Sequence, residues 1–210
     1  MVDFSLYLVT DRGLSMGRAT VDIVRAAIAG GVTCVQLREK HCATREFIEE
    51  ARAVRRLLDA LETKIPLIVN DRLDVALAIG ADGVHLGQSD MRLPDARRLA
   101  GASLLIGISA ESMEDARRAE AEGADYIGIS PVFTTPTKND TAAPLGLEGV
   151  RQIRKAVSLP LVGIGGIHRD NAGAVIRAGA DGVAVVSAIV SAACPRTAAS
   201  ALKQQIQSAR

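Results

Sequence analysis

Two aspartates, Asp71 and Asp90, each stand at the end of a short, mainly apolar run of this sequence, 68–71 and 83–90. A short helix with a glycine stop is predicted between the runs, so both aspartates lie at strand exits, which share one rim in a parallel sheet. Adjacent carboxylates repel unless a cation or a proton lies between them. Mg²⁺ commonly binds one or two carboxylates together with phosphate oxygens of a substrate. The pair therefore indicates a metal site, although Asp71 could instead cap the helix that follows it.

A second group of polar residues, Gln36, Arg38 and Lys40, is spaced by two along another predicted strand. Side chains at this spacing point to the same side of a strand. Two cations on one side suit a polyanionic ligand, because arginine offers a planar fork of donors and lysine a compact charge. The alternative is a solvated strand end, with Glu39 as a local partner of the cations.

The segment 131–146 is predicted to be a long loop, and loops of this length are usually functional or disordered. It contains hydroxyl groups at Thr134, Thr135 and Thr137, next to Lys138. These residues could form a phosphate cradle that closes over a substrate. A mobile polar loop without a ligand is an equally good interpretation of this stretch alone.

A glycine-rich strand exit contains Gly165 and Gly166. The spacing does not match the dinucleotide-binding pattern G-x-G-x-x-G, because His168 occupies the position of the last glycine. Bare glycine amides can approach a phosphate closely, and Val186 and Ser187 end the next predicted strand. The segment therefore favours a phosphate site, with close packing as the alternative.

The remaining polar candidates carry weaker signals. Ser109 ends a predicted strand and could be a turn hydroxyl or a ligand contact. His85 lies inside a strand, where a hydrogen-bonded core histidine is a better expectation than a catalyst. His41 and His168 have no histidine or cysteine partners at metal spacing, so no zinc site is expected. No Ser–His–Asp grouping is visible at motif level.

Eight alternating strand–helix units position these residues. The strands are expected at 6–11, 32–40, 68–71, 83–90, 104–109, 126–130, 161–164 and 183–187; the helices at 21–29, 44–61, 73–80, 94–100, 113–122, 147–157, 170–178 and 195–207. This alternation predicts an α/β fold, a closed (β/α)8 TIM barrel, with an open doubly wound sheet as the alternative. The length of 210 residues suits one domain, 1–210.

A short phrase recurs where helices lead into strands, at 30–32, 80–83, 123–126 and 179–182, and three of its copies read Gly-Ala-Asp. We interpret its glycines as helix stops and the phrase as turn chemistry. It lies at the amino-terminal end of the predicted barrel, whereas the polar strand exits lie at the carboxyl-terminal end. In such barrels the carboxyl-terminal end carries the chemistry.

Composition restricts the class of function. Hydrophobic residues make up 48% of the chain but aromatics only 2%, and the formal net charge is +1. The charge gives no support for nucleic acid or an anionic membrane surface as a partner. No signal segment and no stretch long enough to span a bilayer is recognised. Three scattered cysteines fit reduced thiols, so a cytoplasmic location is expected. The sequence leaves the oligomeric state open and is compatible with a homo-oligomer.

Taken together, the strand ends resemble the thiamine-phosphate synthase family in order and spacing, over nearly the whole chain. The motifs that carry this resemblance are Gln36-Leu37-Arg38-Glu39-Lys40, Val69-Asn70-Asp71, His85-Leu86-Gly87-Gln88-Ser89-Asp90, Gly107-Ile108-Ser109, Pro131-Val132-Phe133-Thr134-Thr135-Pro136-Thr137-Lys138 and Gly163-Ile164-Gly165-Gly166-Ile167. Six motifs in register are far more specific than any one of them.

The resemblance implies a transferase on a (β/α)8 barrel. Such an enzyme joins 4-amino-2-methyl-5-pyrimidinylmethyl diphosphate to a thiazole phosphate, releasing diphosphate. By this resemblance Asp71 and Asp90 would hold Mg²⁺. The pyrimidine diphosphate would be bound by Gln36, Arg38, Lys40, Asn70, Ser109 and Lys138, and the thiazole phosphate by Thr135, Pro136, Thr137, Gly166, Val186 and Ser187. Among these, Arg38, Lys40, Lys138 and Ser109 are the expected catalytic residues.

Two positions depart from the family pattern. Glu111 stands where many members have histidine, and Ser130 where glycine is usual. These departures leave two alternatives open: a relative that tautomerises the thiazole without coupling it, and a non-catalytic sensor of phosphate ligands. Retention of Arg38, Lys40 and Lys138 argues against the first alternative, and no appended effector segment supports the second.

Overall fold

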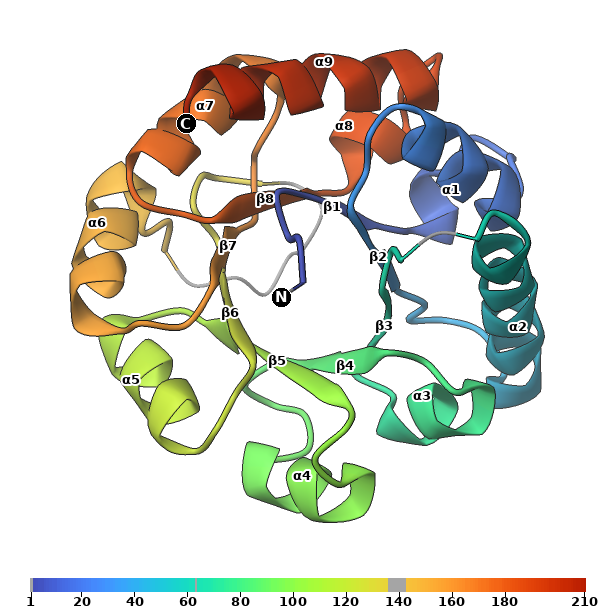
Figure 1. Cartoon of the computed structure of the whole chain (residues 1–210), viewed down its shortest axis with the longest axis horizontal. Coiled ribbons are helices and arrows are strands. Elements are labelled where there is room, and N and C mark those ends of the chain that lie inside the picture. Colours follow the sequence, from blue (N-terminus) through green and yellow to red (C-terminus); the bar gives the residue numbers. More distant parts are fainter. Residues whose placement is uncertain (1, 63, 136–142) are drawn as a thin grey trace.

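Eight parallel strands close into a barrel in chain order (Figure 1). The computed structural model describes residues 2–62, 64–135 and 143–210. The strands are β1 (Leu6–Val9), β2 (Cys34–Leu37), β3 (Leu67–Asn70), β4 (Gly83–Leu86), β5 (Leu105–Ala110), β6 (Tyr126–Ile129), β7 (Leu161–Gly163) and β8 (Gly182–Val185). Pairing of Leu8 with Val185 joins β1 to β8 and completes the ring. The predicted (β/α)8 barrel is confirmed, and the open sheet is excluded.

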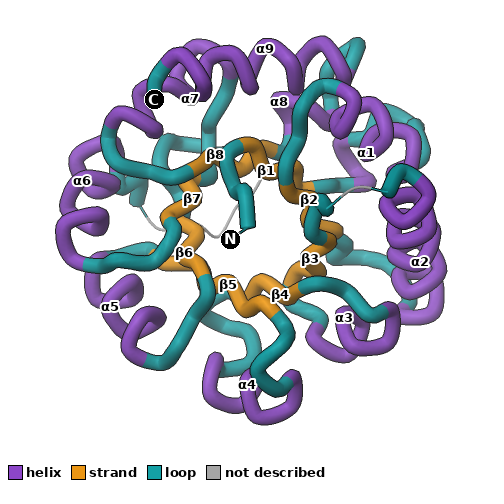
Figure 2. Tube along the Cα trace, viewed as in Figure 1, coloured by secondary structure: helices purple, strands orange, loops and turns teal. Residues whose placement is uncertain are grey.

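Helices form a complete outer layer around the strands (Figure 2). They are α1 (Thr20–Ala29), α2 (Thr44–Ala60), α3 (Leu73–Ile79), α4 (Leu93–Ala100), α5 (Met113–Ala121), α6 (Gly146–Ala156), α7 (Arg169–Arg177), α8 (Ser187–Val190) and α9 (Pro195–Ser208), with a 3₁₀ turn at Arg12–Leu14. The sequence did not predict the 3₁₀ turn or α8. The predicted strand 183–187 was too long, because β8 ends at Val185 and Ser187 begins α8.

Alternation along the strands divides the apolar residues into two cores. In β1, Leu6 and Leu8 pack in the large core between barrel and helices, whereas Tyr7 and Val9 belong to a small core inside the barrel. The interior core also contains Phe4, whose ring centroid lies 4.5 Å from that of Tyr126. Three of the five phenylalanine and tyrosine residues of this chain, Phe4, Tyr7 and Tyr126, therefore lie inside the barrel, where large side chains fill the space.

The amino-terminal segment covers the opening of the barrel at the amino-terminal ends of the strands (Figures 1 and 2). It passes so close to β8 that a Cβ atom at Gly182 would lie 1.9 Å from the carbonyl oxygen of Phe4. Only glycine fits at this position, because any side chain would overlap the backbone of the segment. This end of the barrel is thereby filled.

In the described part of the chain, no helix has both the length and the apolar character needed to cross a membrane.

The repeated phrase at this end has a more specific role than the predicted turn chemistry. One glycine of each copy, namely Gly31, Gly80, Gly123 and Gly179, does have a positive φ angle. In addition, each aspartate side chain accepts a hydrogen bond from a backbone N–H at the start of the preceding strand. It accepts another from an arginine of the helix that comes before that strand. The three sets are Asp82 with Leu67 and Arg55, Asp125 with Ile106 and Arg97, and Asp181 with Leu161 and Arg154, all at 2.6–3.1 Å.

The fourth copy replaces the aspartate with Thr33. Its hydroxyl accepts the Leu6 N–H at 3.1 Å, and its own N–H donates to the Leu6 carbonyl oxygen at 2.8 Å. The same backbone bond joins each aspartate to its strand, as from Asp82 to Leu67 at 2.9 Å. The phrase therefore fixes adjacent strands to each other once in every two strand–helix units, and the interpretation as turn chemistry alone was incomplete.

Candidate active site

One cavity of about 800 Å³ is lined by residues at the carboxyl ends of the strands and in the loops that follow them. It brings together eleven of the residues that the sequence singled out, and these come from seven different strand ends or loops: Gln36, Arg38, Lys40, Asn70, Asp71, Asp90, Ser109, Thr135, Gly166, Val186 and Ser187. Pro136, Thr137 and Lys138 lie outside the described residues. Glu111 and Ser130, the two departures from the family pattern, also line the cavity.

Asp71 and Asp90 face each other in this cavity, beside Lys40. The Lys40 ammonium group forms an ion pair with the Asp71 carboxylate. The pKa of Asp90 is raised, first because burial disfavours its charged form and also because the Asp71 carboxyl group lies against it. The Gly87 N–H, at 2.7 Å from the Asp90 carboxylate, and the charge of Lys40 oppose this increase. Two carboxylates in contact are suited to hold a cation between them.

The backbone at Asp71 is in the left-handed region, with φ of 61°. Non-glycine residues adopt this conformation at some cost, and such residues are common at functional sites. Helix α3 begins after Arg72, whose side chain makes no capping hydrogen bond. Within the described residues, the contacts of the Asp71 carboxylate are with Lys40 and Asp90, so the structure gives no support to the capping alternative.

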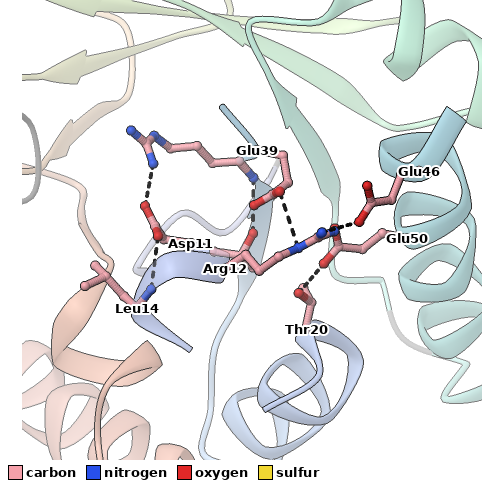
Figure 3. A network of polar contacts seen from close by, with 9 residues as sticks. Asp11, Arg12, Leu14, Thr20, Glu39, Glu46 and Glu50 are labelled. Carbon is pink, nitrogen blue, oxygen red and sulfur yellow. Dashed lines mark hydrogen bonds and ion pairs between the residues drawn. The ribbon is translucent and has the colours of Figure 1, made fainter. Parts of the chain in front are cut away.

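Arg38 is held in the cavity wall by Asp11, from the loop after β1. One Asp11 oxygen accepts from the Arg38 guanidinium at 2.6 Å, and the other accepts the Leu14 N–H at 3.2 Å (Figure 3). The Thr10 hydroxyl accepts the Arg38 N–H at 3.1 Å. The aspartate therefore links the guanidinium directly to the backbone of the 3₁₀ turn. Sequence reasoning did not identify this role of Asp11.

The neighbouring Arg12 points away from the cavity and joins the same loop to α2. Its guanidinium forms ion pairs with Glu39, Glu46 and Glu50 (Figure 3). Glu50 also accepts a hydrogen bond from Thr20 at the start of α1. In the alternative interpretation Glu39 was a local partner of the strand-end cations, but in the structure its ion-pair partner is Arg12. The alternation of Arg38 and Glu39 thus separates a cavity-facing cation from an outward-facing carboxylate.

The glycine-rich exit of β7 packs closely against the loop after β6. A Cβ atom at Gly165 would lie 2.7 Å from the Pro131 Cβ, and one at Gly166 would lie 2.5 Å from the Thr134 carbonyl oxygen. Both glycines have positive φ angles. The close-packing interpretation is therefore correct for these glycines, and since Gly166 also lines the cavity, a phosphate site beside it stays a prediction.

A buried polar network that lines the cavity inside the barrel was not recognised in the sequence. It contains Tyr7 and Tyr126, whose hydroxyl oxygens are 2.9 Å apart. His85 was expected to be a hydrogen-bonded core histidine, and its ring nitrogens do lie 3.0 Å from Tyr126 and from Ser109. Burial lowers the pKa of His85 to about 4. The signal in the sequence was the placement of the only two tyrosines at inward-facing strand positions, where a buried hydroxyl requires a partner.

Comparison with known proteins places this geometry in a family. The chain is similar to the thiamine-phosphate synthases of Albidiferax ferrireducens, with 56% identity over 96% of this chain and 91% of the relative, and of Chloroflexus aurantiacus, with 57% identity over 91% and 88%. A solved structure of thiamine phosphate pyrophosphorylase from Pyrococcus furiosus matches with a TM-score of 0.90 and 42% identity, over 99% of this chain and 97% of that one.

Solved structures with much lower identity show only the fold. A 3-hexulose-6-phosphate synthase matches with a TM-score of 0.72 at 18% identity. By contrast, the family model described as thiamine monophosphate synthase matches residues 6–189, and this range includes all the described strand ends that line the cavity. On this match and the close relatives, the chain belongs to the thiamine monophosphate synthase family.

Proposed function

We propose that residues 1–210 act as one catalytic domain that couples 4-amino-2-methyl-5-pyrimidinylmethyl diphosphate to 4-methyl-5-(2-phosphoethyl)thiazole, or its 2-carboxy form. Family membership gives the enzyme class, a transferase of thiamine biosynthesis acting on small molecules. One observation carries the specific proposal. A single cavity joins a cluster of cations and carboxylates at β2–β4 to a glycine-rich wall at β7–β8, so that two phosphorylated ligands can lie end to end.

The chemical step breaks the bond between the pyrimidine methylene carbon and a diphosphate oxygen, and the electron pair leaves with the diphosphate. The amino-pyrimidine delocalises the positive charge that develops on the methylene carbon, so no protein nucleophile is needed. Arg38 and Lys40 line the cavity and stabilise the departing negative charge. The resemblance adds Lys138 to this group. The lone pair of the thiazole nitrogen then forms the new carbon–nitrogen bond. When the 2-carboxy form is the substrate, its carboxylate leaves as CO2 and a proton from water takes its place.

The residues at the β3 and β4 exits fit a magnesium ion. Asp71 and Asp90 supply hard oxygen ligands in contact with each other, and the pKa of Asp90 is raised partly for that reason. Within the described residues, no group of three or more histidine, cysteine, aspartate or glutamate side chains could hold a metal. Two carboxylates leave coordination positions for phosphate oxygens and water, the usual mode for Mg²⁺. When bound there, Mg²⁺ supplies positive charge to the leaving diphosphate.

Positioning is the main task of the remaining residues. Gln36, Asn70 and Ser109 line the cavity from β2, β3 and β5, and the residues that line it after β6, β7 and β8 include Thr135, Gly166, Val186 and Ser187. We assign the first group to the pyrimidine diphosphate and the second, with Pro136 and Thr137, to the thiazole phosphate. Holding both reactants in line converts a bimolecular reaction into an effectively unimolecular one.

The comparisons do not favour a thiazole tautomerase or a non-catalytic sensor. The relatives with 56% and 57% identity are both thiamine-phosphate synthases. A tautomerase would not need a diphosphate site, yet Arg38, Lys40, Asp71 and Asp90 converge in the cavity. A homo-oligomeric state and a cytoplasmic location stay predictions.

A coupling assay tests the proposed reaction. Purified protein is given both substrates with Mg²⁺, and thiamine phosphate and diphosphate are quantified. We expect the two products in equal amounts. Binding of both substrates without product formation would reject the synthase function.

Lys138→Ala should lower kcat more than it raises the KM for the thiazole phosphate. The reverse result would assign Lys138 to the thiazole side.

A further inference from the structure

A continuous chain of hydrogen-bonding side chains crosses the interior of the barrel and lines the cavity. Gln36 Nε2 lies 2.8 Å from the Tyr7 hydroxyl, which lies 2.9 Å from the Tyr126 hydroxyl. The chain continues at 3.0 Å to His85 Nδ1 and, from His85 Nε2, at 3.0 Å to Ser109 Oγ. Gln36, Tyr7 and Tyr126 are almost completely buried. The chain thus connects β2, β1, β6, β4 and β5 and ends at the Ser109 hydroxyl.

Two strand glycines leave the space that this chain occupies. A Cβ atom at Gly107 would lie 2.1 Å from Cζ of Tyr126 and 2.5 Å from its hydroxyl oxygen. A Cβ atom at Gly128 would lie 3.0 Å from His85 Cε1 and 3.3 Å from Nε2. Glycine weakens a strand and often marks the close approach of another group. Here the closely approaching groups are the two rings, so β5 and β6 have no side chains where the network requires room.

Hydrogen counting gives the chain a direction. A tyrosine hydroxyl has one hydrogen, and a neutral imidazole has one N–H. Gln36 Nε2 can only donate, so Tyr7 accepts from it and has its own hydrogen for Tyr126. Tyr126 then donates to His85 Nδ1, which leaves the imidazole hydrogen on Nε2, facing Ser109.

The opposite direction satisfies the buried groups less well. It would turn the Tyr7 hydrogen toward the thiol of Cys34, which lies next to the Tyr7 hydroxyl and is only a weak acceptor. Buried hydroxyl groups without a good partner cost free energy. The direction that starts at Gln36 is therefore favoured.

We propose that His85 is a positioning residue, held as the Nε2–H tautomer, which donates to Ser109 Oγ and thereby leaves the Ser109 hydrogen for a bound ligand. Ser109 then recognises a hydrogen-bond acceptor, such as a ring nitrogen or phosphate oxygen, rather than an amino group. His85 has both nitrogens engaged by protein partners and is not free to exchange a proton with the ligand. The proposal rests on the proposed function in one respect: the ligand of Ser109 is the pyrimidine diphosphate.

The tautomer can be measured without substrate. The protein contains three histidines, so ¹⁵N-histidine labelling gives few signals, and His85→Gln identifies those of His85. In the unliganded protein near pH 7 we expect a protonated Nε2 and an unprotonated Nδ1. Protonation at Nδ1 would overturn the proposal whatever the activity of the enzyme. An Nε2–H tautomer in a protein that does not couple the substrates would instead contradict the proposed function.

A double-mutant cycle tests whether the network acts through Ser109. Tyr126→Phe keeps the ring and removes the donor to His85, so we expect kcat/KM for the pyrimidine diphosphate to fall about two- to tenfold, the value of one neutral hydrogen bond. In a Ser109→Ala background the same change should have no further effect. An equal loss in both backgrounds would reduce Tyr126 and His85 to a structural role and overturn the proposal.

Two further variants distinguish an effect on the hydrogen-bond network from a general loss of stability. Gly128→Ala displaces the His85 ring by a few tenths of an ångström and removes no hydrogen-bonding group, so it should give a smaller loss with the same dependence on Ser109. Ser112→Ala removes a hydroxyl that caps α5. It should lower the melting temperature without altering the KM for the pyrimidine diphosphate. A Gly128→Ala loss that persists in the Ser109→Ala background would count against the proposal.

Discussion

Aspartates stand at both ends of the barrel, but their partners differ. At the amino-terminal end, Asp125 accepts hydrogen bonds from the Ile106 N–H and the Arg97 guanidinium, and Asp82 and Asp181 repeat this arrangement. At the carboxyl-terminal end, Asp90 lies against another carboxyl group, that of Asp71. One end compensates its charges within the chain, and the other brings like charges together in a cavity.

The difference separates residues that hold the barrel together from residues that await a ligand. A carboxylate that accepts a backbone N–H and faces an arginine has its hydrogen-bonding capacity used by the fold. Lys40 offsets the pair of carboxylates at Asp71 and Asp90 only in part, because the pKa of Asp90 stays raised. With its left-handed backbone at Asp71, the pair is unfavourable until a further cation is bound. Unfavourable arrangements of this kind are typical of functional sites, where stability is lost for activity.

Replacement of Asp90 should give the largest effect on activity. In Asp90→Asn the amide oxygen can still accept the Gly87 N–H, so the turn is retained, but half of the carboxylate pair is lost. We expect turnover to fall about 10²-fold or more, as for the loss of an electrostatic contact in a transition state. Thermal unfolding without Mg²⁺ should show an unchanged or higher melting temperature. Unchanged turnover would make the carboxylate structural and remove the contrast between the two ends.

The opposite pattern is expected at the amino-terminal end. Asp125→Ala leaves the Ile106 N–H without its side-chain acceptor and Arg97 without its ion pair, so the free energy of unfolding should fall by about 1–3 kcal/mol. Its kcat and KM should be unchanged at a temperature well below unfolding. Asp95→Ala, which removes an exposed ion pair with Arg98, is the matched control. It should change neither the free energy of unfolding nor the kinetic constants. A kinetic defect in Asp125→Ala would show that the two ends are coupled.

The pH dependence of stability should report the buried network of Tyr7, Tyr126 and His85. The pKa of His85 is lowered from 6.5 to about 4, so the folded state favours the neutral ring. The stability that this provides is complete above pH 6.5 and is lost as the pH falls toward 4, because the unfolded chain takes up the proton first. The stability difference between wild type and His85→Gln, from chemical denaturation at several pH values, should shrink over this range. A constant difference would mean that His85 is not buried as a neutral ring.

A smaller kinetic effect is expected from replacing Asp11, which holds a cavity residue in place without lining the cavity itself. Asp11 binds Arg38 on one side and the backbone of the 3₁₀ turn on the other. Asp11→Asn keeps the backbone contact and weakens the hold on Arg38, so the KM for the pyrimidine diphosphate should rise about three- to tenfold. The KM for the thiazole phosphate is the internal control. Equal increases in both values would indicate a general disturbance of the rim rather than loss of Arg38 orientation.

Local patterns in the sequence were sufficient to predict the barrel and most of its rim. Strand–helix alternation gave the fold, and the spacing of Gln36, Arg38 and Lys40 placed all three in the cavity, because strand geometry alone decides which side chains share a face. Strand ends were less accurate: β2 was expected at 32–40 and covers Cys34–Leu37. Residues 38–40 follow β2 without backbone pairing to a neighbouring strand, which a single segment cannot reveal.

Contacts between distant segments could not be predicted from the sequence. The Tyr7–Tyr126 contact joins residues 119 positions apart, and the link from Asp11 to Arg38 spans 27. The aspartates of the repeated phrase were recognised as recurring, but their bonds to the preceding strand depend on how the barrel closes. The two glycines that make room for Tyr126 and His85 look like any other strand glycine until the rings are in place.

The sequence by itself therefore determined the fold class, the end of the barrel that carries the chemistry and the types of residue gathered there. These properties follow from the periodicity of apolar and polar residues, which can be recognised within a short segment. The tertiary structure decided which carboxylates meet and which are satisfied by the backbone, because closure of the barrel brings together side chains from strands far apart in the chain. Asp71 and Asp90 illustrate both contributions: their position at strand exits is local, and their contact is tertiary.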